Sequence, residues 1–129
     1  MTPTRDKPRI LVVEDQPEVQ ETMLYLLRRV GCDAVGARTG TEGMQRARTG
    51  GFDLITLDID LPDADGRELC RRLKQDLHLR DVPVILVSGR SCDGGRQSYS
   101  ELGAVDYIVK PFDAFVFVSR VFLHLKTTR

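Results

Sequence analysis

Five polar residues of this 129-residue chain follow short apolar segments, and their types together suit phosphoryl chemistry. They are Glu14, Asp15, Asp58, Ser88 and Lys110. Three carboxylates brought close together repel one another, so some would take up protons unless a cation neutralised them. A hard divalent cation with oxygen ligands, Mg²⁺ or Mn²⁺ in its place, resolves that repulsion. A lysine and a serine can hold phosphate oxygens, and an aspartate can act as the nucleophile that accepts a phosphoryl group.

The apolar pattern predicts the elements that would bring these residues together. Short apolar runs indicate five strands, at residues 9–13, 33–37, 53–57, 82–87 and 105–109. Helical spacing or helix-start signals follow each run, near residues 17, 41, 67, 95 and 113. The third helix is expected to end near Leu77 and the last near Lys126. Five such βα units predict an α/β, flavodoxin-like three-layer sandwich with a parallel five-stranded sheet of order 2-1-3-4-5.

In that order the first, third, fourth and fifth strands are consecutive neighbours. The site of an open α/β sheet lies beyond the carboxyl ends of the strands, where the strand order reverses. The five polar residues therefore converge on one rim. Each of them alone could be a turn former or a solvated charge, and we interpret Asp63 and Asp65 in that way, with Asp65 close to a helix start.

Four stretches then match one known family in order and spacing. They are Val12–Asp15, Leu57–Gly66, Val87–Ser88 and Gly103–Phe112. The sequence resembles the receiver domain of two-component response regulators, of the single-domain, chemotaxis-regulator-like kind, over residues 9–126. Residues 1–8 are then expected to be a flexible N-terminal segment and residues 127–129 a C-terminal tail.

The resemblance implies a phosphoacceptor and a metal site. Asp58 is the expected phosphoacceptor. Glu14 and Asp15 are expected to hold Mg²⁺ together with Asp58 and the backbone carbonyl of Asp60. The side chain of Asp60 adds a further carboxylate, which could tune metal affinity or the dephosphorylation rate.

The resemblance also implies how the site is switched. Ser88 and Lys110 are expected to contact the phosphoryl group, and the bond between Lys110 and Pro111 is expected to be a cis peptide. Movement of Ser88 would vacate space that Tyr107 fills, changing the face formed by helix 4, strand 5 and helix 5. The simpler interpretation of Tyr107 is a half-buried strand tyrosine.

The implied partner is a sensor histidine kinase or a histidine phosphotransfer protein, which donates the phosphoryl group from a phosphohistidine. The implied function is a phosphorylation-dependent signalling switch of a two-component system or phosphorelay, not an enzyme. The alternative is a receiver-fold scaffold for protein interaction that does not use phosphate. A nucleotide-binding enzyme is disfavoured, because the chain contains no GxGxxG and no GxxxxGK[ST] motif.

Two segments depart from a simple monomeric receiver. Gly94 and Gly95 weaken the start of the fourth helix by roughly 1 kcal/mol each, so we expect that helix to be mobile. In the last helix, the side that faces the core is expected to be formed by Phe117, Val118, Val121 and Leu125. The apolar residues left over are Phe115, Val116, Phe122 and Leu123. We expect a homodimer or partner contact through helix 4, strand 5 and helix 5; the alternative is a rotated helix that buries all four.

Composition argues against several other classes of protein, namely nucleic-acid-binding, membrane and secreted proteins. Nineteen basic and nineteen acidic residues give zero net charge, which argues against direct nucleic-acid binding through a general basic field. Apolar runs such as Ile10–Val13 and Val84–Val87 are far shorter than a bilayer requires, so no membrane span is expected. The N-terminus lacks the apolar core of a signal peptide. Three widely spaced cysteines fit reduced thiols and a cytoplasmic location. The zero net charge hides an uneven distribution of charged residues along the chain, since residues 53–68 hold six acids and one base.

Overall fold

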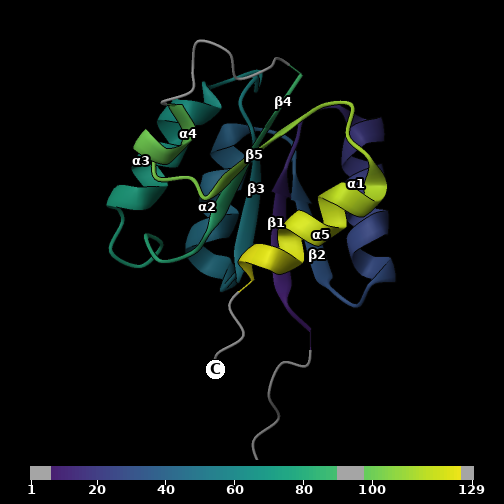
Figure 1. Ribbon diagram of the computed structural model, residues 1–129. Helices are drawn as coiled ribbons and strands as arrows, with labels where there is room; N and C mark the ends of the chain where they lie inside the picture. The colour runs from purple at the N-terminus through teal and green to yellow at the C-terminus, as the bar shows by residue number, and fades with distance from the viewer. Residues whose placement is uncertain (1–6, 90–97, 126–129) are drawn as a thin grey trace, which may run out of the picture.

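The structure is a computed structural model, described over residues 7–89 and 98–125. Five parallel strands form one sheet in the order β2-β1-β3-β4-β5 (Figure 1). The strands are β1 (Arg9–Val13), β2 (Asp33–Ala37), β3 (Leu54–Asp58), β4 (Val84–Ser88) and β5 (Asp106–Val109). The predicted fold class and strand order are confirmed.

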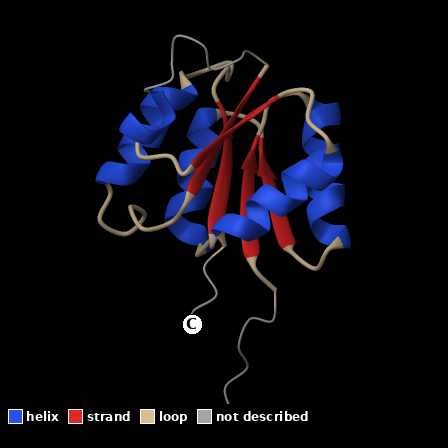
Figure 2. Ribbon diagram, in the orientation of Figure 1, coloured by secondary structure: helices blue, strands red, loops and turns tan. Residues whose placement is uncertain are grey.

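Helices cover both faces of the sheet (Figure 2). They are α1 (Pro17–Arg29), α2 (Gly40–Gly50), α3 (Gly66–Gln75), α4 (Ser98–Glu101) and α5 (Ala114–His124). One face of the sheet packs against α1 and α5, and the other packs against α2, α3 and the residues that follow α4. Among the described helices, none combines the length and the apolar character that crossing a bilayer requires.

Alternate residues of each strand feed the two cores. In β1, Leu11 and Val13 pack on the α2 side, while Ile10 and Val12 pack on the α1 side. All four are buried, as expected for a parallel strand with helices on both faces. Packing on both faces fixes the strands relative to one another, so the residues at their carboxyl ends have defined positions.

Strands β3, β4 and β5 begin one or two residues later than the sequence predicts. In β4 the reason is Pro83, which has no N–H to donate to the sheet, so pairing with β3 starts at Val84. Because these strands lie later in the chain, Asp58 falls inside β3 and Ser88 falls inside β4. Asp58 pairs with Val87, and Ser88 pairs with Val109. Both functional side chains therefore stand on sheet backbone and not on a free loop.

The predicted helix ends are partly wrong. The sequence predicts that α3 runs to Leu77, but it ends at Gln75 because Asp76 is extended and its carboxylate accepts the N–H of His78. For the fourth helix, only Ser98–Glu101 is described; the expected effect of Gly94 and Gly95 lies outside the described residues. The predicted end of the last helix near residue 126 also lies outside them.

The close approach of α3 to β3 requires a glycine at position 66. A Cβ at Gly66 would lie 2.2 Å from the backbone oxygen of Asp58 and 2.7 Å from the Cα of Ile59. The N–H of Gly66 donates to the Ile59 carbonyl at 2.8 Å, and the Asp65 carboxylate caps α3 by accepting the N–H of Arg67 at 2.9 Å. The loop after Asp58 is thus pinned at both of its ends.

We predict that Gly66→Ala lowers the free energy of unfolding by about 2 kcal/mol or more, because the new methyl group overlaps backbone that cannot move aside. Helix propensity alone would give the opposite sign. Urea unfolding measures the difference. Gly89→Ala is the control, since a Cβ there meets nothing within 4 Å; equal stability of the two variants would contradict the prediction.

Candidate functional site

The carboxyl ends of four neighbouring strands carry the residues predicted from the sequence. Asp58 ends β3, Ser88 ends β4, and Glu14 and Lys110 directly follow β1 and β5. Glu14 and Asp58 are almost completely buried, at 1% and 2% exposure, although both are acids. Buried acids need a compensating partner, because the protein interior solvates charge poorly.

Three of the four predicted metal ligands, the carboxylates, form one cluster. One carboxylate oxygen from each of Glu14, Asp15 and Asp58 lies within 4.8 Å of the others. Three oxygen ligands converging at this spacing, two of them buried, fit a hard divalent cation such as Mg²⁺. The residues present therefore suit the metal that the sequence predicts.

Lys110 reaches into this cluster. Its Nζ lies 3.2 Å from Glu14 Oε1 and 3.5 Å from Asp58 Oδ2. It also donates to the side-chain oxygen of Gln16 at 3.4 Å, a contact that the sequence interpretation missed. Lys110 thus balances part of the acidic charge and stands where it can reach a group added to Asp58.

The pKa of Asp58 is shifted strongly. Burial raises the pKa of Asp58 to about 7, and the nearby charge of Glu14 pushes it in the same direction. The N–H of Asp60, which donates to Asp58 Oδ1 at 3.1 Å, and the ammonium of Lys110 oppose the shift. Without a metal, Asp58 is therefore partly protonated near neutral pH.

Ser88 lies beside Asp60. The Ser88 hydroxyl is buried and donates to Asp60 Oδ2 at 3.4 Å. The backbone N–H of Asp60 faces Asp58, so this residue links the hydroxyl to the carboxylate cluster. The metal contact expected from the Asp60 carbonyl stays a prediction.

The segment after β5 closes one side of the site. The Lys110–Pro111 peptide bond is cis. The ring of Phe112 stacks on Phe117 of α5, with centroids 5.0 Å apart. Beside the acids an open pocket is lined by Val19 and Thr22 of α1 and by Pro111 and Phe112. An incoming group would therefore pass between α1 and this segment.

Tyr107 lies on β5, which is separated by β4 from the strand that carries Asp58. It is half-buried in β5 and its ring is tilted against Tyr99 of α4, with centroids 6.4 Å apart. Its neighbour Asp106 accepts from Arg120 at 2.8 Å and contacts His124 Nε2 at 2.9 Å. The switching role of Tyr107 stays a prediction.

Asp63 and Asp65 stay outside the cluster and cap helices. Asp65 caps α3, while Asp63 accepts the N–H of Gly40 at 2.7 Å and the N–H of Thr41 at 3.0 Å, at the start of α2. Both residues are therefore structural, and Asp63 ties the loop after Asp58 to a second helix.

Comparison with known proteins identifies the family. A family model described as the response regulator receiver domain matches residues 10–122. This chain belongs to that family. The family is one of signalling domains of two-component systems, and phosphorylation and Mg²⁺ binding are typical of it.

Curated relatives of this receiver domain include transcriptional regulators. The transcriptional activator protein IrlR of Burkholderia pseudomallei is 39% identical over 113 residues, covering 88% of this chain and 48% of IrlR. The alkaline phosphatase synthesis transcriptional regulatory protein PhoP of Bacillus subtilis is 36% identical over 104 residues, 81% of this chain and 42% of PhoP. The receiver domain spans about half the length of these relatives.

Solved receiver structures superpose closely. The non-phosphorylated HemR receiver domain from Leptospira biflexa has a TM-score of 0.85 at 32% identity, covering 95% of this chain and 98% of its own. The response regulator TrrA from Thermotoga maritima, in complex with Mg²⁺–BeF, has a TM-score of 0.80 at 29% identity, covering 90% and 97%.

We predict that Asp58→Asn stabilises the metal-free receiver domain at pH 8 by up to about 4 kcal/mol, since the pKa of Asp58 rises from 3.8 to about 7 and each pKa unit corresponds to about 1.4 kcal/mol. The raised pKa of Asp58 means that the folded state loses stability as pH rises from about 4 to about 7, where the buried carboxylate ionises. The gain should therefore be small at pH 5. Urea unfolding in EDTA at both pH values measures it.

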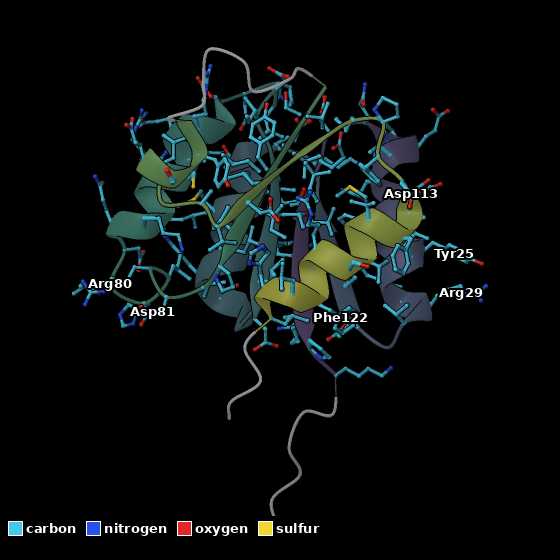
Figure 3. The ribbon with its side chains drawn as sticks, in the orientation of Figure 1. Tyr25, Arg29, Arg80, Asp81, Asp113 and Phe122 are labelled. Carbon is cyan, nitrogen blue, oxygen red and sulfur yellow. The ribbon has the colours of Figure 1, made fainter. Side chains whose placement is uncertain are left out.

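Asp81→Asn is the matched control, because Asp81 is exposed and lies towards the opposite end of the sheet (Figure 3). It should leave the free energy of unfolding within about 0.5 kcal/mol of wild type. A loss of stability in Asp58→Asn at pH 8 would show that the buried charge is not a net cost.

Proposed function

We propose that this receiver domain is a phosphorylation-controlled switch of a two-component system or phosphorelay. Asp58 accepts a phosphoryl group from the phosphohistidine of a sensor histidine kinase or histidine phosphotransfer protein. The observation that carries the proposal is the buried Asp58 carboxylate, which shares a cluster with Glu14 and Asp15 and lies 3.5 Å from the Lys110 ammonium.

In this reaction an Asp58 oxygen forms a bond to phosphorus, while the phosphorus–nitrogen bond of the phosphohistidine breaks and its electron pair stays on the imidazole. Mg²⁺, held by Glu14, Asp15 and Asp58, would supply positive charge against the phosphoryl oxygens. The carboxylate is already oriented, since Oδ1 accepts the N–H of Asp60 and Oδ2 faces Lys110.

The phosphoryl group would then change the contacts around it. It brings added negative charge and strong acceptor oxygens, which compete for the Lys110 ammonium and the Ser88 hydroxyl. Ser88 would exchange its contact to Asp60 for one to the phosphoryl group. We propose that Tyr107 responds to this movement and so alters the surface of α4, β5 and α5.

Two further observations agree with the proposal. TrrA, which this chain resembles over most of its length, is solved as a complex with Mg²⁺–BeF. The thiols of Cys32 and Cys70 are buried and unpaired, which supports the proposed cytoplasmic location.

The test is incubation with Mg²⁺ and acetyl phosphate, measured by intact mass. We expect wild type and Asp81→Asn to gain the mass of one phosphoryl group, and Asp58→Asn to gain none. EDTA should abolish the gain in wild type. A gain that survives Asp58→Asn, or no gain in wild type, would overturn the proposal and favour a scaffold that does not use phosphate.

The outer surface of α5 supports a second part of the proposal, a homodimer through α4, β5 and α5. Phe117 and Val121 are completely buried, and Val118 and Leu125 are partly buried against the same core. Phe115 and Leu123 are 78% and 71% exposed, and Val116 and Phe122 are also exposed. The alternative of a rotated helix that buries these side chains is wrong. Figure 3 shows Phe122 on the outer side of α5.

The β5 edge extends this apolar surface, because Val105 and Val109 are exposed beside it. Asp106 of β5 is paired with Arg120 and His124 of α5, so polar contacts link the strand to the helix. A surface that combines exposed apolar side chains with paired polar groups suits a second copy of the same face.

We predict that beryllofluoride with Mg²⁺ shifts the wild-type chain towards a dimer in light-scattering chromatography, while Leu123→Glu stays monomeric. The introduced carboxylate would have to lose its water in the interface. Gln45→Glu, at an exposed position of α2 outside the pocket and outside this face, is the charge-matched control. A monomer in both states at high protein concentration would refute the homodimer.

A further inference from the structure

Gln20 is a buried polar residue that the proposed reaction does not use. It lies on α1 and is only 7% exposed. Its side-chain amide donates to two backbone carbonyls, Glu14 at 3.1 Å and Ala37 at 3.0 Å. These carbonyls belong to the carboxyl ends of adjacent strands, so one side chain joins α1, β1 and β2 immediately behind the acidic cluster.

Strand β2 is shaped for this side chain. A Cβ at Gly36 would lie 2.6 Å from Cδ and 2.6 Å from Oε1 of Gln20. Gly36 pairs with Val12 in the middle of the strand, where a glycine weakens the strand and is unexpected unless something approaches closely. The absent side chain at Gly36 and the buried amide of Gln20 therefore form a matched pair.

The contacts of Gln20 converge on Glu14. The N–H of Glu14 donates at 2.9 Å to the same Ala37 carbonyl that Gln20 contacts. The Glu14 carbonyl accepts from Gln20, and the carboxylate accepts the N–H of Gln16 at 3.2 Å. Glu14 is thus held at its nitrogen, its carbonyl and its side chain. Gln20 bonds only to backbone here, so it leaves the carboxylate oxygens to a metal and to Lys110.

We propose that Gln20 is a positioning residue for the divalent-cation site. By fixing the peptide between Glu14 and Asp15, it sets the direction in which both carboxylates leave the end of β1. Replacing a residue that orients the ligands of a metal typically weakens metal binding about 10- to 100-fold. The proposal rests on the proposed function for the identity of the site, but it concerns metal binding and not phosphoryl transfer.

The test is a calorimetric titration of the unphosphorylated chain with Mg²⁺ alone. Gln20→Met keeps the length of the side chain and removes its donors. We expect the Mg²⁺ dissociation constant to rise roughly tenfold. The control is Gln45→Met, the same replacement at an exposed helical position on α2, which should bind within about twofold of wild type.

A second variant reaches the same contact from the other side. Gly36→Ala should displace the amide of Gln20, whose end is flexible, and weaken Mg²⁺ binding by a similar factor. In a Gln20→Ala background the amide is already absent, so adding Gly36→Ala should change the dissociation constant less than about twofold. Such coupling would not arise if each change merely loosened the fold.

Hydrogen exchange gives a readout that needs no metal. The amides of Glu14 and Gln16 should exchange faster in Gln20→Met, and those of the distant α3 should not. Folded Gln20→Met and Gly36→Ala proteins that bind Mg²⁺ within twofold of wild type would overturn the proposal. A wild-type chain that binds no Mg²⁺ would contradict it as well. If Mg²⁺ binding weakens as expected but wild type takes no phosphoryl group, the role of Gln20 stands and the proposed function fails.

Discussion

The carboxylates of Glu14 and Asp58 are buried side by side, and much of the site follows from the need to tolerate that arrangement. Burial of the Asp58 carboxylate raises its pKa to about 7, and the nearby charge of Glu14 adds to that rise. The Lys110 ammonium, at 3.2 Å from Glu14 and 3.5 Å from Asp58, offsets part of the repulsion. A divalent cation or an added phosphoryl group changes this balance directly, so the stability of the domain is coupled to its chemistry.

Such a cluster has to be held by the backbone, because its side chains would otherwise move apart. The parallel sheet supplies the main support, with Asp58 and Ser88 inside paired strands. Gly66 allows α3 to press against the end of β3, and Asp63 ties the same loop to the start of α2. On the other side of the sheet Gln20 ties β1 to β2. At this rim Glu14, Asp15 and Asp58 form the cluster, whereas Asp63 and Asp65 accept backbone N–H groups at the starts of α2 and α3.

Helix α5 connects the site to the surface. Its first turn is capped by Asp113, and Phe117 in its inner face stacks on Phe112, two residues after Lys110. Its outer face carries exposed apolar side chains, and Arg120 and His124 bind Asp106 of β5. A displacement of Lys110 by a phosphoryl group would therefore act on a segment packed directly against α5. This contact is the physical link that the proposed switch uses.

Short-range pattern was enough to predict the architecture of this receiver domain and the convergence of Glu14, Asp58, Ser88 and Lys110 on one rim. Apolar runs, Pro17 and Gly31 act over a few residues, so β1 and β2 were placed to the residue, and polar types at strand ends indicated the acid and lysine cluster. Tertiary packing decided how deeply each acid is buried, because Glu14 and Asp15 are adjacent acids at the end of the same strand, yet Glu14 is buried and Asp15 is partly exposed. It also decided the role of Gln20, whose partner Ala37 lies 17 residues away. A hydrogen bond between residues so far apart leaves no periodic signal in the chain, and only the fold brings its two ends together.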